Sequence, residues 1–171
     1  MTIFSLYIIN KSGGLIYQHD LSPGLAKITS NDALILAGTI HGVFAIASKI
    51  TPTALKVSKT SGQSNTLYSR SNGGAISSNT SGLRSVETEK FSMYIFQTLT
   101  GLKFLLVTSP GGINASSNDI NKGSEYAENV LSGVYSLYSD YVMKNPFYEV
   151  EMPIRLDLFD KKIVELVNKL G

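Results

Sequence analysis

The stretch between Asp32 and Lys49 contains no charged residue. Its apolar residues recur at three- and four-residue spacing, which predicts a helix. Ser30 or Asn31 can cap its start, and Thr51-Pro52 ends it after about Ile50. Its most apolar part, Leu34–Ile50, is slightly too short for a membrane span, contains His41 and two glycines, and carries Lys49 near its end, so a buried helix is the better interpretation.

This predicted helix is apolar on two sides. One stripe is formed by Leu36, Ile40, Val43, Phe44 and Ala47, and a second face by Ile35, Gly42, Ile46 and Ile50. A helix that is apolar almost all round must be buried on more than one side. In a chain of 171 residues the sheet can cover one side, but little chain is left for the other. We therefore expect the second face to be a permanent interface with a partner subunit.

Short runs rich in β-branched and aromatic residues predict strands. They alternate with turns, among them Lys11-Ser12-Gly13-Gly14, where adjacent glycines supply positive φ. Because the central runs are apolar on both faces, helices must cover both faces of the sheet. The sequence predicts one α+β domain over residues 1–171, an α-β-α sandwich with a five-stranded antiparallel sheet. The expected strands are Ile3–Asn10, Leu15–His19, Leu83–Glu89, Phe91–Leu99 and Lys103–Thr108. Two further helices are expected, one from about Asp119 to Asn145-Pro146 and one from Asp157.

A polar segment interrupts this pattern. From Ser58 to Gly82, eighteen of twenty-five residues are Ser, Thr, Asn or Gly. Such a composition has little to bury, so we expect a flexible loop at about 59–82, without regular structure and dispensable for folding.

The residues that usually carry chemistry are scarce. Cysteine is absent, which excludes disulfides, thiolate catalysis and Cys-ligated zinc. His19 and His41 are the only histidines; we expect the first to be solvated and the second to be a satisfied core or interface residue. The sequence has no nucleophile elbow or phosphate loop, and a net charge of +2 is too small for nucleic-acid binding. We expect no catalytic site, metal or cofactor.

The segment Met143–Arg155, here called the strap, combines Pro, Met and aromatic residues with charges. It can pack as a connection over the edge of the sheet. It can also present a protein-binding surface, since aromatics, Met and Arg anchor interfaces. Both interpretations can hold together.

Four segments carry a family resemblance: Asn10–Gln18, His41–Pro52, Gln97–Phe104 and Leu137–Arg155. In this order and spacing they closely resemble the synbindin family, small subunits of the TRAPP vesicle-tethering complex. The resemblance covers nearly the whole chain and fails only between about Lys59 and Gly82, where animal members carry an additional small domain. It implies a longin fold, which is SNARE-like and similar to profilin.

The resemblance also implies a function. TRAPP subunits assemble side by side into a rod whose core is a guanine-nucleotide exchange factor for the Rab GTPase of ER-to-Golgi transport. The expected role is that of a non-catalytic core subunit that contributes to the surface docking the GTPase. We assign this contact to Met152, Pro153, Ile154 and Arg155. The expected location is cytoplasmic, peripherally on cis-Golgi and ER-to-Golgi membranes, with other TRAPP subunits as partners.

Three alternatives stay open at this point. A longin SNARE needs a heptad helix and usually a C-terminal anchor, which the sequence does not show. A small chain of a clathrin-adaptor coat complex shares the fold but lacks the NKSGG hairpin and the strap sequence. An enzyme would need a catalytic constellation that the residues do not supply.

Overall fold

An antiparallel sheet forms the centre of the molecule, and its strands follow the order β2-β1-β7-β6-β5. The computed structural model describes residues 2–22, 28–50, 69–70, 76–77, 83–110 and 117–170, with only the backbone for 69–70, 76–77 and 117–122. Each neighbouring pair of strands is antiparallel, as expected from the sequence. The strands are β1 (Ile3–Ile9), β2 (Leu15–Asp20), β5 (Ser85–Glu87), β6 (Ser92–Gln97) and β7 (Lys103–Thr108).

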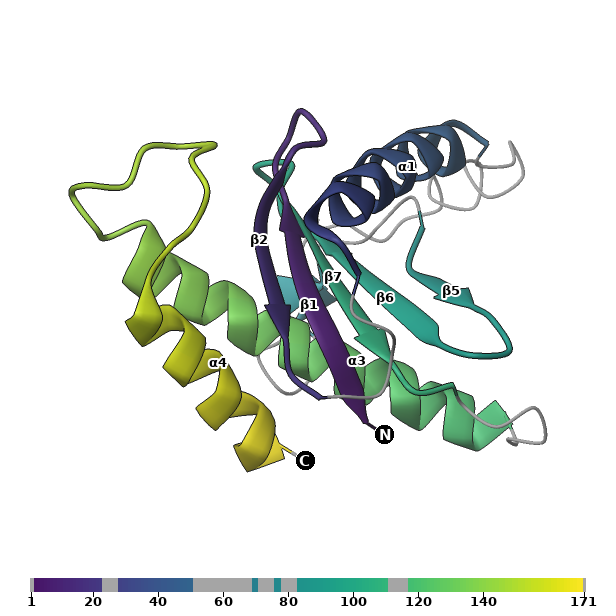
Figure 1. Ribbon diagram of the computed structural model, residues 1–171. Coiled ribbons are helices and arrows are strands. Elements are labelled where there is room, and N and C mark those ends of the chain that lie inside the picture. Colours follow the sequence, from purple (N-terminus) through teal and green to yellow (C-terminus); the bar gives the residue numbers. More distant parts are fainter. Residues whose placement is uncertain are drawn as a thin grey trace.

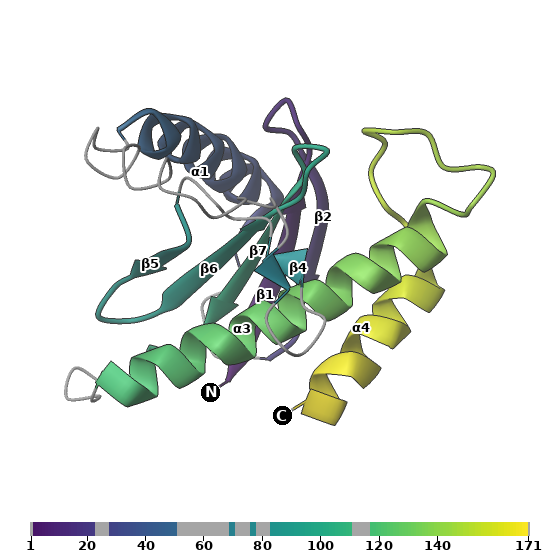
Figure 2. The same ribbon diagram turned by 180° about the vertical axis from the view of Figure 1, so that it is seen from behind.

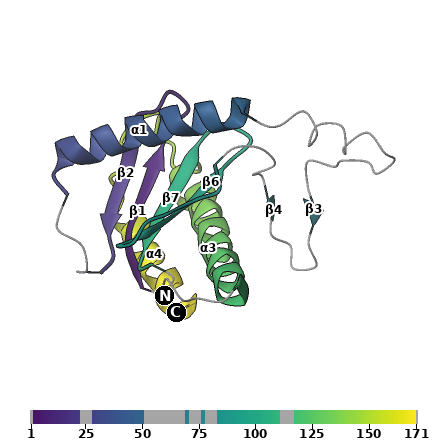
Figure 3. The same ribbon diagram turned by 90° about the vertical axis from the view of Figure 1, so that its right-hand side faces the viewer.

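Helices cover both faces of this sheet. Helix α1 (Ser30–Lys49) crosses one face, whereas α3 (Ser117–Leu137) and α4 (Asp157–Leu170) lie side by side on the other (Figures 1 and 2). Seen along the sheet, α1 forms one layer and the two later helices form the opposite one (Figure 3). The predicted α-β-α sandwich with a five-stranded antiparallel sheet is confirmed.

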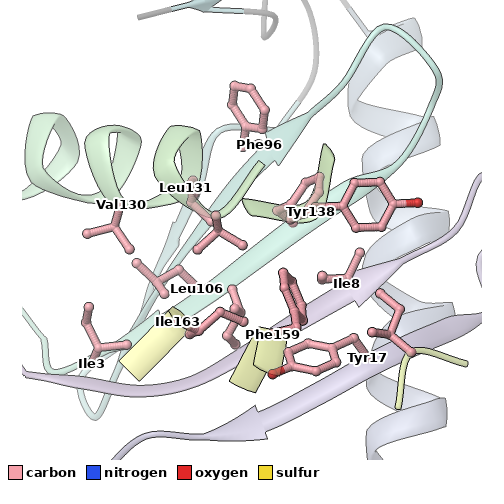
Figure 4. Packing of buried hydrophobic residues seen from close by; sticks show 14 of the residues in the cluster. Ile3, Ile8, Tyr17, Phe96, Leu106, Val130, Leu131, Tyr138, Phe159 and Ile163 are labelled. Atoms are coloured by element: carbon pink, nitrogen blue, oxygen red, sulfur yellow. The ribbon is translucent and has the colours of Figure 1, made fainter. Parts of the chain in front are cut away.

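The alternation of side chains along the strands produces two cores. In β7, Phe104 and Leu106 belong to a core under α3 and α4. Figure 4 shows Leu106 in this core beside the buried Phe159 and Ile163. Leu105, between Phe104 and Leu106 in sequence, belongs to the smaller core under α1. Period-two side-chain geometry therefore explains why the central strands are apolar at nearly every position.

Both hairpin turns use glycine for its backbone freedom. In the turn between β1 and β2, Gly13 has φ +96°, while Gly14 donates its N–H to Asn10 Oδ1 at 2.6 Å. In the turn between β6 and β7, Gly101 has φ +90°. A left-handed conformation favours glycine because it lacks a Cβ. The predicted hairpin at residues 11–14 is confirmed, although only one of its two glycines takes a positive φ.

Two local expectations need correction. Strands β3 (Ser69–Arg70) and β4 (Ile76–Ser77) pair in a two-residue antiparallel ladder inside the segment expected to have no regular structure. The other residues of 59–82 lie outside the described part of the chain. Helix α3 continues into a π-helical turn, η1 (Tyr138–Val142), in which Met143 donates its N–H to Tyr138 O at 3.1 Å. The predicted helix therefore continues to Val142, but its last turn is π-helical and not α-helical.

Candidate protein interface

Helix α1 begins with a well-formed cap. Thr29 is the N-cap: its Oγ1 accepts the Asp32 N–H at 3.2 Å, and its hydroxyl donates to the Asp32 carboxylate at 2.7 Å. Asp32 and Lys49 lie at the ends where their charges favour the helix dipole. The predicted caps, Ser30 or Asn31, are one or two residues late. Local interactions therefore determine where the helix begins, whatever covers its outer surface.

The inner side of α1 is buried, and its outer side is not. Ala33, Ala37, Ile40 and Phe44 are buried against the sheet. Large apolar residues on the outer side remain exposed, among them Ile35 and Ile46 at 60% each and Ile50 at 68%. We call this surface the α1 outer face; it consists of Leu34, Ile35, Gly38, Gly42, Val43, Ile46 and Ile50.

All four predicted subunit-interface residues, Ile35, Gly42, Ile46 and Ile50, lie on the α1 outer face. Of the predicted inner stripe, Val43 is instead 41% exposed. The helix is thus more open in the single chain than its sequence predicted. By length and composition alone α1 could also cross a membrane, but its inner side forms part of a protein core.

The two glycines of this face have no structural partner. A Cβ added at Gly38 or Gly42 would meet no heavy atom within 4 Å, and neither residue has a positive φ. Glycine in a helix interior costs about 1 kcal/mol relative to alanine. Nothing in the described part of the chain requires glycine at these positions. They leave the α1 backbone open to close approach from outside.

The strap projects from the opposite side of the sheet, between η1 and α4 (Figure 1). Phe147 and Val150 are 87% and 73% exposed, and Met152 is 46% exposed. Glu151 has φ 76° in a turn in which Met152 donates its N–H to Glu149 O at 3.1 Å. A non-glycine residue in this region is uncommon and strained. Sequence reasoning did not single out Val150 or the strain at Glu151.

The predicted GTPase contact is only partly available. Met152, Pro153 and Arg155 are exposed, but Ile154 is buried, and its N–H donates to Ile16 O at 2.8 Å on the outer edge of β2. Ile154 therefore anchors the strap to the sheet, and its inclusion as an exposed contact residue is wrong. The contact role of the other three stays a prediction.

The two histidines lie in different surroundings. His19 stacks on Tyr17 with ring centroids 6.1 Å apart. His41 is half-buried, and its Nδ1 lies 3.3 Å from Lys103 Nζ. Burial, and secondarily the charge of Lys103, lowers the pKa of His41 below its ordinary value. Within the described residues no group of three or more His, Asp or Glu side chains could hold a metal ion.

The buried lysine is a functional candidate that sequence reasoning missed. Lys103 is 4% exposed, although it opens a strand and lies beside a turn. Its ammonium also donates to Gly101 O at 3.3 Å and lies 5.3 Å from the centroid of the Phe44 ring. Burial lowers the pKa of this amine. An unusual signal existed in the sequence: a lysine within an otherwise apolar strand.

Fold and surface together define an α-β-α protein whose α1 outer face is apolar and exposed. The model described as the sybindin-like family matches residues 3–170, and the chain belongs to that family. The trafficking protein particle complex subunit 4 of Dictyostelium discoideum is 39% identical over 168 residues, which cover 98% of each chain.

More distant relatives of this chain are also subunits of the trafficking protein particle complex. The human subunit 4 is 32% identical over 158 residues, which cover 91% of this chain but only 56% of the human one. The chain thus spans a little over half the length of its mammalian relatives. Subunit 1 of the same complex from Dictyostelium discoideum is 21% identical over 92% of this chain and 88% of its own. Among solved structures, Myxococcus xanthus MglB aligns with 78% of this chain and 84% of its own, at a TM-score of 0.39 and 13% identity.

Proposed function

We propose that this chain is a non-catalytic core subunit of a TRAPP complex and that a neighbouring subunit covers the α1 outer face. The observation that carries the proposal is this exposed apolar face on a chain that matches a TRAPP subunit 4 along its whole length. Full burial of an isoleucine side chain contributes about 1.5–3 kcal/mol. Covering Ile35, Ile46 and Ile50 together would therefore supply a substantial part of the binding energy of a stable subunit contact.

Co-purification tests this role. A tagged chain expressed in its own cells should copurify with homologues of other TRAPP subunits, identified by mass spectrometry. In this role the chain works in the cytoplasm and reaches cis-Golgi and ER-to-Golgi membranes through the complex, so the tag should colocalise with a cis-Golgi marker. Recovery of a different assembly, such as a clathrin-adaptor coat, would contradict the proposal.

The interface prediction is tested in the same preparation with Ile46→Asp. A charge on an exposed position should leave the urea unfolding midpoint of the isolated chain nearly unchanged, because surface substitutions usually stay within about 0.5 kcal/mol. The same charge in a covered interface would be buried without a partner, so at least one subunit should be lost from the preparation.

Leu158→Asp is the matched control. Leu158 is 55% exposed on α4, on the opposite side of the sheet from α1, and the substitution should retain every subunit. If Ile46→Asp retains them all as well, α1 is not a subunit interface. If it unfolds the isolated chain, the position belongs to the core.

Nucleotide exchange on a Rab GTPase is the second role in which we expect this chain to take part. An exchange factor needs no covalent chemistry; it needs a surface that binds the nucleotide-free GTPase better than the nucleotide-bound form. The exposed strap residues Met152, Pro153 and Arg155 are suited to such a surface, because Arg binds carboxylates and backbone carbonyls through a planar fork of donors. We propose that they contribute to a composite Rab-binding surface of the assembled complex.

Charge reversal at Arg155 tests this contribution. Arg155→Glu should leave the complex assembled and slow Rab nucleotide exchange about tenfold, or roughly 1.4 kcal/mol of docking energy. Exchange rate and subunit composition are measured on the same sample, with Lys144→Glu as a matched reversal nearby on the strap. An unchanged rate would make the exposed strap residues structural only. Loss of subunits would place Arg155 in a subunit contact instead.

A further inference from the structure

Three segments far apart in the sequence meet at one end of the sheet. A Cβ at Gly13, in the turn between β1 and β2, would lie 3.0 Å from His41 Cγ on α1. A Cβ at Gly101, in the turn between β6 and β7, would lie 3.1 Å from Lys11 Cγ. Lys103 at the start of β7 reaches His41 from below the helix. The two turns and the middle of α1 therefore form one packed unit, in which three basic side chains gather.

This unit contains no carboxylate to balance its charge. The described ion pairs join Arg84 to Glu128, Lys144 to Asp140 and Lys162 to Glu165, and all lie elsewhere. Asp32, on α1 itself, is engaged by Thr29 at the first turn of the helix. Residues 23–27, 51–82 and 111–116 contain no Asp or Glu at all. Lysine is almost never fully buried unless it is paired. Within the described residues no carboxylate pairs with Lys103, so its charge is open to a carboxylate from another molecule.

The contact between Lys103 and His41 determines which atom of His41 can bind an incoming negative charge. An ammonium can only donate, so His41 Nδ1 accepts from Lys103, and the proton of the neutral imidazole is on Nε2. Within the described residues, His41 Nε2 forms no hydrogen bond. Nor is Nε2 one of the described side-chain atoms that are fully buried without a hydrogen-bond partner. His41 thus has an accessible N–H donor at Nε2, while its other ring nitrogen contacts the buried Lys103 ammonium. Lys11, exposed on the neighbouring turn, adds a second positive charge.

The Nε2–H group of His41 lies next to the α1 outer face. Gly38 and Gly42 lie three residues before and one residue after His41, and both leave open space over the helix backbone. A polypeptide that packs on this face can therefore bring a side chain to the imidazole. Charge complementarity selects an acidic one.

We propose that the segment covering the α1 outer face carries an Asp or Glu whose carboxylate accepts a hydrogen bond from His41 Nε2 and balances Lys103. This inference rests on the proposed subunit interface and adds the chemistry of the partner. An apolar contact fixes where the partner binds, and a single carboxylate fixes its register along α1.

The pKa of His41 in the free chain and in the purified complex tests the proposal. Deuterium exchange at the imidazole C2 position, followed by mass spectrometry across pH, measures it in assemblies of any size and separates His41 from His19 by peptide. The charged groups near His41 in the free chain are Lys103 on β7 and Lys11 on the turn. A docked carboxylate favours the imidazolium, so the His41 pKa should be higher in the complex than in the free chain. An unchanged or further lowered pKa overturns the proposal, because an uncharged cover would desolvate the ring without stabilising its cation.

A charge-removal variant gives an independent readout. Lys103→Met keeps the length of the side chain and removes the buried ammonium, so the isolated chain should unfold at an equal or higher urea concentration. Binding of the neighbouring subunit at low salt should weaken at least tenfold, while Lys90→Met, on the turn at the other end of the sheet, should have no effect (Figure 1). Wild-type affinity of Lys103→Met overturns the proposal. If Ile46→Asp loses the subunit and the His41 pKa does not rise, only the carboxylate is wrong; if Ile46→Asp retains all subunits, the interface itself is wrong.

Discussion

Tyr17 links two layers of the molecule through one polar contact in an apolar core. Its hydroxyl donates to Asp160 Oδ1 at 2.5 Å, across 143 residues of sequence, and its ring packs edge-on against Phe159 at 5.1 Å. Burial, followed by this hydrogen bond and the carboxylate charge, raises the pKa of Tyr17 well above its ordinary value. The neutral phenol therefore holds the first turn of α4 against β2.

This contact predicts a loss of stability at alkaline pH. The unfolded chain releases the Tyr17 proton near pH 10, whereas the folded chain keeps it because its pKa is raised. The contribution to the free energy of unfolding is complete below pH 10 and falls as pH rises above that value. Urea unfolding at pH 7, 9 and 11 measures the loss.

Tyr17→Phe isolates the contribution of this residue. The variant should be about 1.5–3 kcal/mol less stable at pH 7, because Asp160 loses a charge-assisted hydrogen bond. It should then lose less stability than the wild type between pH 9 and 11. Tyr126→Phe, on the partly buried surface of α3, is the matched control. Equal alkaline losses in Tyr17→Phe and in the wild type would contradict this account.

Individual residues were the hardest level to predict from sequence. Ile154 looked like an exposed contact, but the strap has no regular periodicity that tells which side chains point inward. The contact of Lys103 with His41 spans 62 residues, and only the packed turns bring the two together. The first-helix positions Ile35, Gly42, Ile46 and Ile50 were easier, because helical periodicity assigns each residue to a side.

At the scale of elements, α1 is stabilised locally, although its apolar outer face is exposed. Its cap, the favourable charges at its two ends and its buried inner side explain why it forms. Its exposed glycines work against it, since nothing in the described chain packs on them. Strands β1, β2, β6 and β7 were predicted within two residues at each end, because their apolar runs are continuous. Strand β5 is shorter than the expected Leu83–Glu89 and is mostly exposed. The π-helical turn at the end of α3 has no comparable signal in the sequence.

Gly42→Ala separates helix stability from binding. The isolated chain should gain up to about 1 kcal/mol in the free energy of unfolding, because alanine is a better helix former and its Cβ meets nothing. Gly133→Ala on α3 is the contrasting control, since its Cβ would lie 2.9 Å from Leu166 Cδ2 and the gain should disappear. If a partner approaches the α1 backbone closely, Gly42→Ala should also weaken the complex. A stabilised chain that binds its partner unchanged would show that the partner does not approach at Gly42.

At the scale of the whole molecule, the two faces of the sheet are unequal. The face under α3 and α4 has a large core covered by two helices, whereas the other has a smaller core under α1. The layer order followed from sequence because both faces of the strands were apolar. What covers the α1 outer face could not follow, because the proposed partner is a separate chain whose residues are not in this sequence.

Amide hydrogen exchange of α1 in the free chain and in the purified complex tests the central claim most directly. Exchange reports local opening, which becomes rarer when a partner covers a helix. We predict that amides of Ser30–Lys49 exchange at least tenfold more slowly in the complex, while those of α4 change little. Equal exchange of α1 in the free chain and in the complex would contradict the claim that its outer face is a subunit interface.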